Sequence, residues 1–111
     1  MSITPALLTP SAALPNATAS FYTTPATGQT MVRRAVFTNT DTVPHTVTVN
    51  RVPSGGAAAT ANQVISAYRL APGQAYVAVE LTNMVLNGGD ALYGVCDTAA
   101  KVNVTMSGIT F

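Results

Sequence analysis

His45 and Cys96 are the only histidine and the only cysteine of the chain, and so the first candidates for chemistry. An imidazole that takes the proton of a thiol is the pair that a cysteine hydrolase uses. However, His45 follows Pro44 at the point where a strand should begin, and no helix N-terminus is expected near Cys96 to lower its pKa. We therefore predict structural roles for both: His45 as a surface or strand-end residue, and Cys96 as a small core hydrophobe.

The acidic residues do not suggest a second catalytic centre. They are Asp41, Glu80, Asp90 and Asp97. Three of them lie in turn signals, where Asp41 is expected to bond its own backbone, so a carboxylate pair for glycoside hydrolysis has little support. Calcium would need a dense acidic cluster, and the stretches "NGGD" and "PSGG" are not followed by a phosphate-binding helix. We expect no catalytic residue, no metal and no cofactor.

Two adjacent arginines and three prolines are the candidates for binding. Arg33 and Arg34 lie inside the apolar run "MVRRAVF", so either one of them points to the inner sheet face, or the strand lies at an edge or at an interface. The edge and the interface remain open alternatives. The candidate interface residues are Arg33, Arg34, Pro5, Pro10 and Pro15.

Two tyrosines are the only candidates for a sugar site. Tyr68 and Tyr76 flank the "LAPGQ" hairpin and could pack across from one another. Carbohydrate-binding sandwiches usually rely on exposed Trp or stacked Tyr, and this chain has no Trp. A glycan site is therefore the lesser alternative.

The elements that must position these residues have the periodicity of strands. Three runs alternate apolar and polar residues, at 46–50, 75–81 and 101–106, which is typical of half-buried antiparallel strands. Turn signals separate the runs at 23–29, 39–45, 53–62, 71–74, 87–90 and 97–101. Seven or eight short strands at this spacing predict an all-β, antiparallel β-sandwich, either a jelly roll or an immunoglobulin-like fold.

Three local features qualify this prediction. The stretch 57–70 is the best helical candidate because of its alanines, but we favour a loop followed by a strand. The last strand changes its apolar parity near Gly108, which suggests a β-bulge there. Residues 1–18 contain three prolines and predict an extended N-terminal arm that lies on another surface, so that the sandwich domain spans 19–111.

The composition limits the partners. Charged residues make up 8% of the chain and its net charge is +1, with no basic stripe, so we expect no nucleic acid. The first twenty residues lack a basic start and a long apolar run, so neither a secretion signal nor a membrane partner is expected. Few charges also mean little repulsion between copies, which favours a homo-oligomer.

The series "VFTNTDTVPHTVTVNRVPSGG", "LAPGQAYVAVEL" and "VLNGGDALYGVCDTAAKVNVTMSGITF" resembles small structural proteins of tailed-bacteriophage virions. In that group a strand ends in an Asn-Thr-Asp turn, a Pro-Gly hairpin follows, and a Gly-Asp turn precedes a closing Val-Asn-Val strand. The resemblance covers about residues 32–111. It rests on turn chemistry and β-alternation.

The resemblance implies a virion component without enzymatic activity, and no catalytic residue is carried over. The leading expectation is a capsid decoration (cement) protein that assembles as a homotrimer on the major capsid protein. The alternative is a tail, neck or head-fibre module that contacts the host surface. In either case the protein would be made in the cytoplasm of the bacterial host and reside in the virion.

Overall fold

A computed structural model describes residues 4–111, in which nine strands and two short 3-10 turns make up the regular structure. The strands are β1 (Thr4–Ala13), β2 (Ala19–Thr23), β3 (Thr30–Asn39), β4 (His45–Val52), β5 (Gln63–Leu70), β6 (Ala75–Val77), β7 (Val85–Leu86), β8 (Ala91–Cys96) and β9 (Val102–Thr110). The 3-10 turns are η1 (Thr60–Asn62) and η2 (Val79–Leu81). This stretch contains no α-helix, as predicted.

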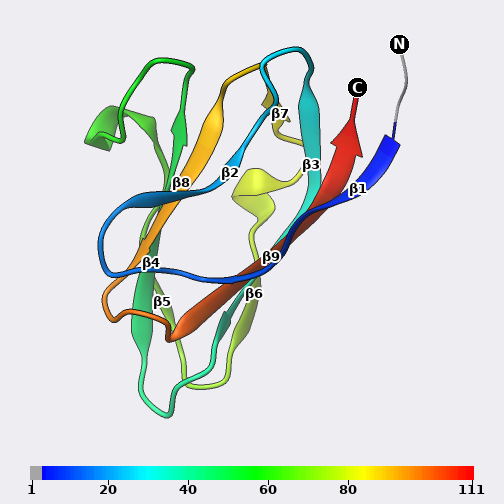
Figure 1. Ribbon diagram of the computed structural model, residues 1–111. Coiled ribbons are helices and arrows are strands. Elements are labelled where there is room, and N and C mark those ends of the chain that lie inside the picture. Colours follow the sequence, from blue (N-terminus) through cyan, green and yellow to red (C-terminus); the bar gives the residue numbers. More distant parts are fainter. Residues whose placement is uncertain (1–3) are drawn as a thin grey trace.

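The strands form two antiparallel sheets packed as a sandwich (Figure 1). One sheet has the order β1-β9-β3-β6, with β7 also pairing with β3, and the other has the order β2-β8-β4-β5. The strands pair from the two ends of the chain inward, as in one long hairpin that is rolled up into two sheets. β1 pairs with β9, β2 with β8, β3 with β6, and β4 with β5. This is the arrangement of a jelly roll, which decides between the two topologies left open by the sequence.

The core lies between the sheets and is built by the alternation that the sequence predicted. Val47 and Val49 of β4 face Val102 and Val104 of β9 across one buried cluster, to which Phe37 of β3 also belongs. All five side chains are at most 2% exposed. Each β-branched side chain suits the pleated, half-buried surface of its sheet, so strand preference and burial act together here.

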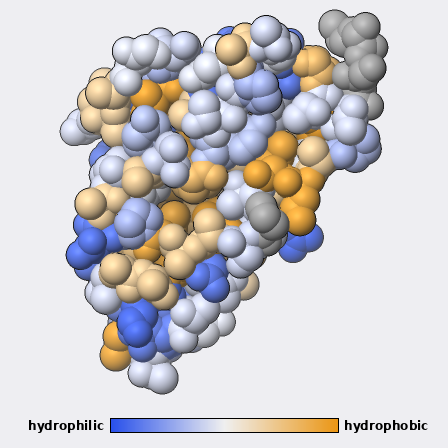
Figure 2. All heavy atoms as spheres, viewed as in Figure 1, coloured by the Kyte–Doolittle hydropathy of each residue, from blue (hydrophilic) through white to orange (hydrophobic). Residues whose placement is uncertain are grey.

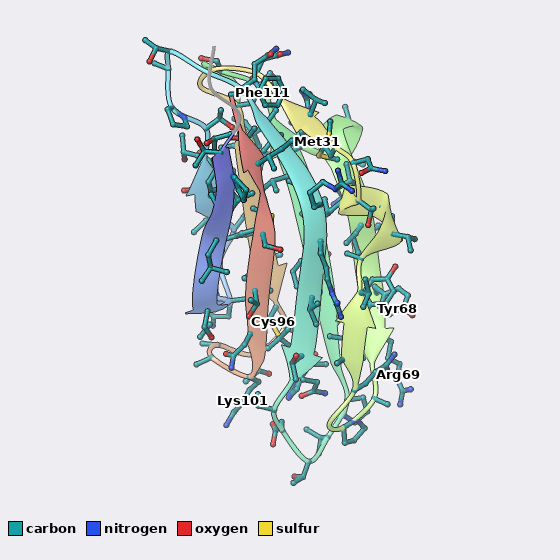
Figure 3. All side chains as sticks on the ribbon, turned by 90° about the vertical axis from the view of Figure 1, so that its right-hand side faces the viewer. Met31, Tyr68, Arg69, Cys96, Lys101 and Phe111 are labelled. Carbon is teal, nitrogen blue, oxygen red and sulfur yellow. The ribbon has the colours of Figure 1, made fainter. Side chains whose placement is uncertain are left out.

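The N-terminal segment corrects the predicted arm. Residues 4–13 are extended, as expected, but they form β1, the outer strand of the first sheet (Figure 3). Leu14, which follows this strand, is 1% exposed and belongs to the core. Prolines are tolerated because one side of an edge strand has no ladder partner to lose. The pairing of β1 with β9 also shifts register twice, between Leu7 and Thr9 and between Thr9 and Ala12. The predicted boundary at residue 18 is therefore wrong for these residues.

The run 75–81 also differs from its prediction. The strand β6 ends at Val77, and the chain then turns into η2. As a result Val77 and Val79 are 41% and 71% exposed, while Ala78 and Leu81 are buried. Alternation predicted the opposite faces for Val77, Ala78 and Val79 and the correct one for Leu81, because it assumes that one strand continues through all seven residues.

Residues 57–70 follow the favoured interpretation, a loop followed by a strand. Only η1 interrupts the loop, and β5 begins directly after it at Gln63. Within β5, Ala67 has a φ of 46°, and its N–H donates to Thr48 Oγ1 at 3.0 Å. All of the helix-forming alanines except Ala67 thus lie before the strand, where no packed face supports a helix.

The β-bulge predicted near Gly108 lies in the partner strand. Val32 pairs with Gly108 and Arg34 with Ser107, so that Arg33 is the extra residue in β3. In β9, Gly108 keeps the buried parity of Met106. A Cβ atom on Gly108 would stand 2.2 Å from the carbonyl oxygen of Met31, so the backbones approach too closely for any other residue.

Candidate functional site

His45 is the first residue of β4, and the turn before it is built around Asn39. The Asn39 side chain is fully buried; its Nδ2 donates to the carbonyl oxygen of Val43 at 2.9 Å, and its Oδ1 accepts from Asp41 N at 2.9 Å. Asp41 Oδ1 then accepts from Thr42 N at 2.7 Å. These bonds confirm that Asp41 bonds its local backbone and show that Asn39 does so as well, and they fix the carboxylate of Asp41 beside the start of β4.

His45 lies between two aspartates. Its Nε2 is 2.8 Å from Asp41 Oδ2, and its Nδ1 is 2.7 Å from Asp97 Oδ1. The imidazole is 5% exposed, so it is a buried strand-end residue and not a surface one. Because each ring nitrogen faces a carboxylate oxygen, the ring satisfies both contacts when both nitrogens are protonated.

The carboxylates and the imidazole shift each other's pKa. The hydrogen bond to Asp41 raises the pKa of His45 above 6.5, opposed by burial and helped by Asp97. The hydrogen bond from His45, followed by that from Thr42 N, lowers the pKa of Asp41. Burial works to raise the pKa of Asp97, but the bonds from His45 and Cys96 outweigh it and leave this pKa below 3.8. The fold therefore favours the protonated imidazole, and in that form the group is an ionic bridge.

Cys96 is a core residue, as predicted, and is 1% exposed. Its Sγ donates to Asp97 Oδ1 at 3.4 Å. Burial, and then the bond to Asp97, raises the pKa of the thiol, so the sulfur is protonated at neutral pH. The hydrogen bond of the thiol goes to the carboxylate, and the two ring nitrogens of His45 are already taken. This geometry does not match a Cys–His nucleophile pair.

Asp97 is the partner of His45 that sequence reasoning missed. It lies 52 positions from His45 and was seen only as part of a turn signal. The pairing of Val47 with Cys96 brings the start of β4 beside the end of β8, and this register places Asp97 next to the imidazole. No local pattern could reveal the contact, since it depends on which two strands pair.

A second ion pair links β4 and β8 at the end opposite to the His45 cluster. Arg51, near the end of β4, donates to Asp90 Oδ2 at 2.9 Å, just before β8 begins. The same oxygen accepts from Asn87 N at 3.1 Å, and Asp90 Oδ1 accepts from Ser54 N at 3.1 Å. The Asp90 side chain is 8% exposed. Its buried carboxylate thus holds together the loop of Ser54 and the loop of Asn87.

Arg33 and Arg34 are both exposed, which corrects the expectation for this pair. The extra residue at the bulge lets two consecutive side chains leave the inner face, so neither points inward. The strand β3 is internal, with β9 on one side and β6 and β7 on the other, so the edge alternative is wrong as well. The interface alternative stays a prediction.

The three prolines lie along the N-terminal segment. Pro5 is opposite Ile109 in the pairing of β1 with β9, and Pro10 lies further along β1. Pro15 lies after the strand, where its carbonyl oxygen accepts from Cys96 N at 2.9 Å. Thus Pro15 helps to join the first sheet to the strand that ends at the His45 cluster, a role in the fold besides the predicted interface.

Tyr68 and Tyr76 do pack across from one another. Their rings stack with centroids 4.1 Å apart and an interplanar angle of 16°, joining β5 of one sheet to β6 of the other. Tyr76 Oη donates to Glu80 Oε1 at 2.6 Å, and burial, followed by this bond, raises the pKa of Tyr76 to about 12. One face of each ring is thus covered by the other ring and is not open to a sugar. Figure 3 shows Tyr68 at the outer edge of the molecule.

Two shallow hollows lie away from the His45 cluster. Their volumes are about 260 and 280 Å³. The first lies beside Asn50 and Thr60, and the second beside Gly28 and Phe111. Their lining side chains are neutral, so the charged cluster and the hollows are separate features of the described surface.

Comparison with known proteins gives one structural neighbour. No protein-family profile and no curated protein sequence matches the chain. A chain from the structure of infectious bursal disease virus, Gx strain, superposes with a TM-score of 0.47 at 14% sequence identity. The match covers 98% of this chain and 30% of that chain, so this chain spans less than a third of its neighbour's length.

Proposed function

We propose that the protein is a non-enzymatic structural component of a bacteriophage virion, and specifically a capsid decoration protein. Its sequence resembles small virion proteins over residues 32–111, and its jelly roll is an architecture used by viral capsid and lectin domains. Fold alone does not assign a function. The observation that carries the proposal is therefore the character of the surface.

The described surface combines few free charges with exposed apolar side chains. Two ion-pair groups involve His45, Arg51 and three of the four acidic residues. On the face that Figure 2 shows, pale areas cover much of the surface, with an orange, apolar patch on the right and blue, polar side chains at the lower left. The large hydrophobic residues that stay exposed are Leu7, Val43, Tyr68, Val77, Val79 and Val85.

Three of these exposed residues follow one another along the side of β3. Val77, Val79 and Val85 belong to β6, η2 and β7, all of which pack against β3. Arg33 and Arg34 lie in the stretch of β3 between its pairing with β7 and its pairing with β6. Apolar residues with arginine beside them are typical of protein interfaces. We call these five residues the Val-Arg surface.

The Val-Arg surface is the proposed contact within a homotrimer or with the major capsid protein. A subunit that binds only the assembled shell stabilises it by mass action, and many copies add modest contacts to a large total. The tail, neck or head-fibre role is the alternative, and it differs in copy number.

Localisation in a purified particle tests the proposal. Cryo-electron microscopy should find hundreds of copies on the shell, arranged about local threefold positions. A dozen copies or fewer at the tail or neck would favour the alternative. A protein that is absent from the particle would overturn the virion role itself.

Two matched variants test the contact. Val79→Asp should abolish trimer formation or shell binding, because it places a charge in an apolar contact. Val43→Asp, at an exposed position in the turn before β4, should leave both unchanged. Light scattering and co-sedimentation with undecorated shells measure the two properties. Equal binding by the two variants would contradict the Val-Arg surface.

A further inference from the structure

We infer that His45, Cys96 and Asp97 form a binding site for a zinc-class metal ion. The three residues offer one nitrogen, one sulfur and one oxygen ligand atom, all within 4.8 Å of one another. Nitrogen and sulfur ligands together favour Zn²⁺ over Mg²⁺ and Ca²⁺, which prefer oxygen alone. The sequence predicted no metal because His45 begins β4 while Cys96 and Asp97 lie at the end of β8, and only the pairing of these strands brings them together.

The distances suit a tetrahedral ion after a small adjustment. With Zn–N near 2.0 Å and Zn–S near 2.3 Å, the ligand atoms of such a site are about 3.3–3.8 Å apart. Cys96 Sγ is already 3.4 Å from Asp97 Oδ1, and His45 Nδ1 is 2.7 Å from the same oxygen. The Asp97 carboxylate needs to move away from the ring by about half an ångström. The nitrogen of His45 and the sulfur of Cys96, which lie within 4.8 Å of one another, need to come to about 3.5 Å. The Asp97 side chain is 44% exposed in a turn, so it has the space to move.

Asp41 occupies the place of an outer partner. It holds Nε2 of His45 at 2.8 Å, which leaves Nδ1 as the nitrogen directed at the other two ligands. A carboxylate on the distal nitrogen of a metal-binding histidine is the usual arrangement, and it fixes both the tautomer and the ring orientation. The exposed side of Asp97 gives the ion a path from solvent and leaves a fourth position for water.

Binding exchanges two protons for the ion. The ion replaces the Nδ1 proton of the imidazolium and the thiol proton of Cys96, and both protons go to solvent. The two protons carry the same charge as the ion, so the net charge of the cluster does not change. Where both groups are protonated, affinity should rise about 100-fold per pH unit, because two protons leave for each ion bound.

Cobalt(II) titration of the untagged protein tests the site. The chain has one cysteine and one histidine, so a thiolate-to-cobalt charge-transfer band can come only from Cys96. We expect this band at one cobalt per chain at pH 8, its loss on addition of Zn²⁺, and a thermal midpoint that rises with Zn²⁺ concentration. The absence of the band in the wild-type protein would overturn the proposal.

Variants then identify the remaining ligands. His45→Gln and Asp97→Asn should each remove the saturable band, and Asp41→Asn should weaken affinity by about 10- to 100-fold. Glu80→Gln, an exposed acidic residue elsewhere, is the matched control and should bind like the wild type. Circular dichroism checks that each variant is folded. Unchanged affinity in folded His45→Gln or Asp97→Asn protein would show cobalt bound adventitiously through the thiol, and would contradict the site.

Discussion

An ion pair links the paired strands β4 and β8 at each of their two ends, and the two ion pairs differ in chemistry. We call these ion pairs the two closures of the strand pair. In both, an aspartate beside β8 binds a basic side chain of β4: Asp97 binds His45 at one end, and Asp90 binds Arg51 at the other. A guanidinium keeps its charge over the pH range in which an imidazole titrates, and the fold raises the pKa of His45 above 6.5. The ion pair with Arg51 therefore does not depend on protonation of an imidazole, whereas the ion pair with His45 does.

The two closures also differ in what the carboxylate supports. Asp90 accepts bonds from two loop N–H groups besides Arg51, while Asp97 accepts from the side chains of His45 and Cys96. Loss of Asp90 therefore affects the loops themselves. Loss of Asp97 affects chiefly the charge state of His45.

Asp90→Ala should have the largest effect on stability. It removes the acceptor of three hydrogen bonds at a carboxylate that is 8% exposed, which should cost about 2–3 kcal/mol. The thermal midpoint should fall by about 10–15 °C. Calorimetry measures this change, and Arg51→Ala should give a smaller loss because the loop bonds remain. An Arg51→Ala loss as large as that of Asp90→Ala would mean that the ion pair is the main contribution.

His45→Gln should destabilise the protein in a pH-dependent way, by roughly half of the Asp90→Ala loss or less. Because the fold raises the pKa of His45 above 6.5, its contribution is complete below pH 6.5 and is lost as pH rises through the folded value. The lowered pKa values of Asp41 and Asp97 make their contribution present above pH 3.8 and lost as pH falls through the folded values. The ion pairs of His45 with Asp41 and Asp97 therefore contribute most to stability between pH 3.8 and pH 6.5.

Thermal unfolding of the wild type and of His45→Gln from pH 5 to pH 9 measures this dependence. The gap between the two proteins should be widest near pH 5–6 and should narrow toward pH 9. The Arg51 end should show no comparable change over the same range. A gap that widens with pH would mean that the imidazole is held neutral in the folded protein.

Asp41→Asn and Asp97→Asn should have the smallest effects on the thermal midpoint, and they differ in their effect on His45. Both variants keep an oxygen acceptor but remove a charge. Asp41 makes the largest contribution to the raised pKa of His45, so Asp41→Asn should lower this pKa more than Asp97→Asn does. Nuclear magnetic resonance titration of the imidazole compares them. The reverse order would contradict the assigned geometry.

Local patterns predicted those parts of the fold that repeat every two residues. The alternation at 46–49 and 101–106 gave the correct buried faces, because β4 and β9 continue through those residues. Asn50, expected on the outer face, is 4% exposed, and its Nδ2 donates to Ala59 O and to Asn62 Oδ1. The alternation failed at 75–81, where the chain leaves the strand after Val77. The turn 39–45 was also predicted, since Asn and Asp bond their own backbone there.

Long-range pairing explains what the sequence could not reveal. Pro5 and Pro10 argued for a separate arm, but the partner that makes their segment a strand lies about a hundred residues away in β9. The contact of His45 with Asp97 likewise depends on the register of β4 with β8. Cys96 was correctly predicted as a core residue from its type alone, whereas its hydrogen bond to Asp97 was not.

The charge state of His45 is the most direct test of the central claim, that the chain's single histidine is an ionic bridge in the structure and not a catalytic base. Nitrogen-15 nuclear magnetic resonance of the metal-free protein at pH 6.5 reports both ring nitrogens, and one histidine gives an unambiguous signal. We predict that most molecules carry a proton on both Nδ1 and Nε2, with a titration midpoint above 6.5. A neutral ring with one free nitrogen and a midpoint below 6.5 would contradict the account.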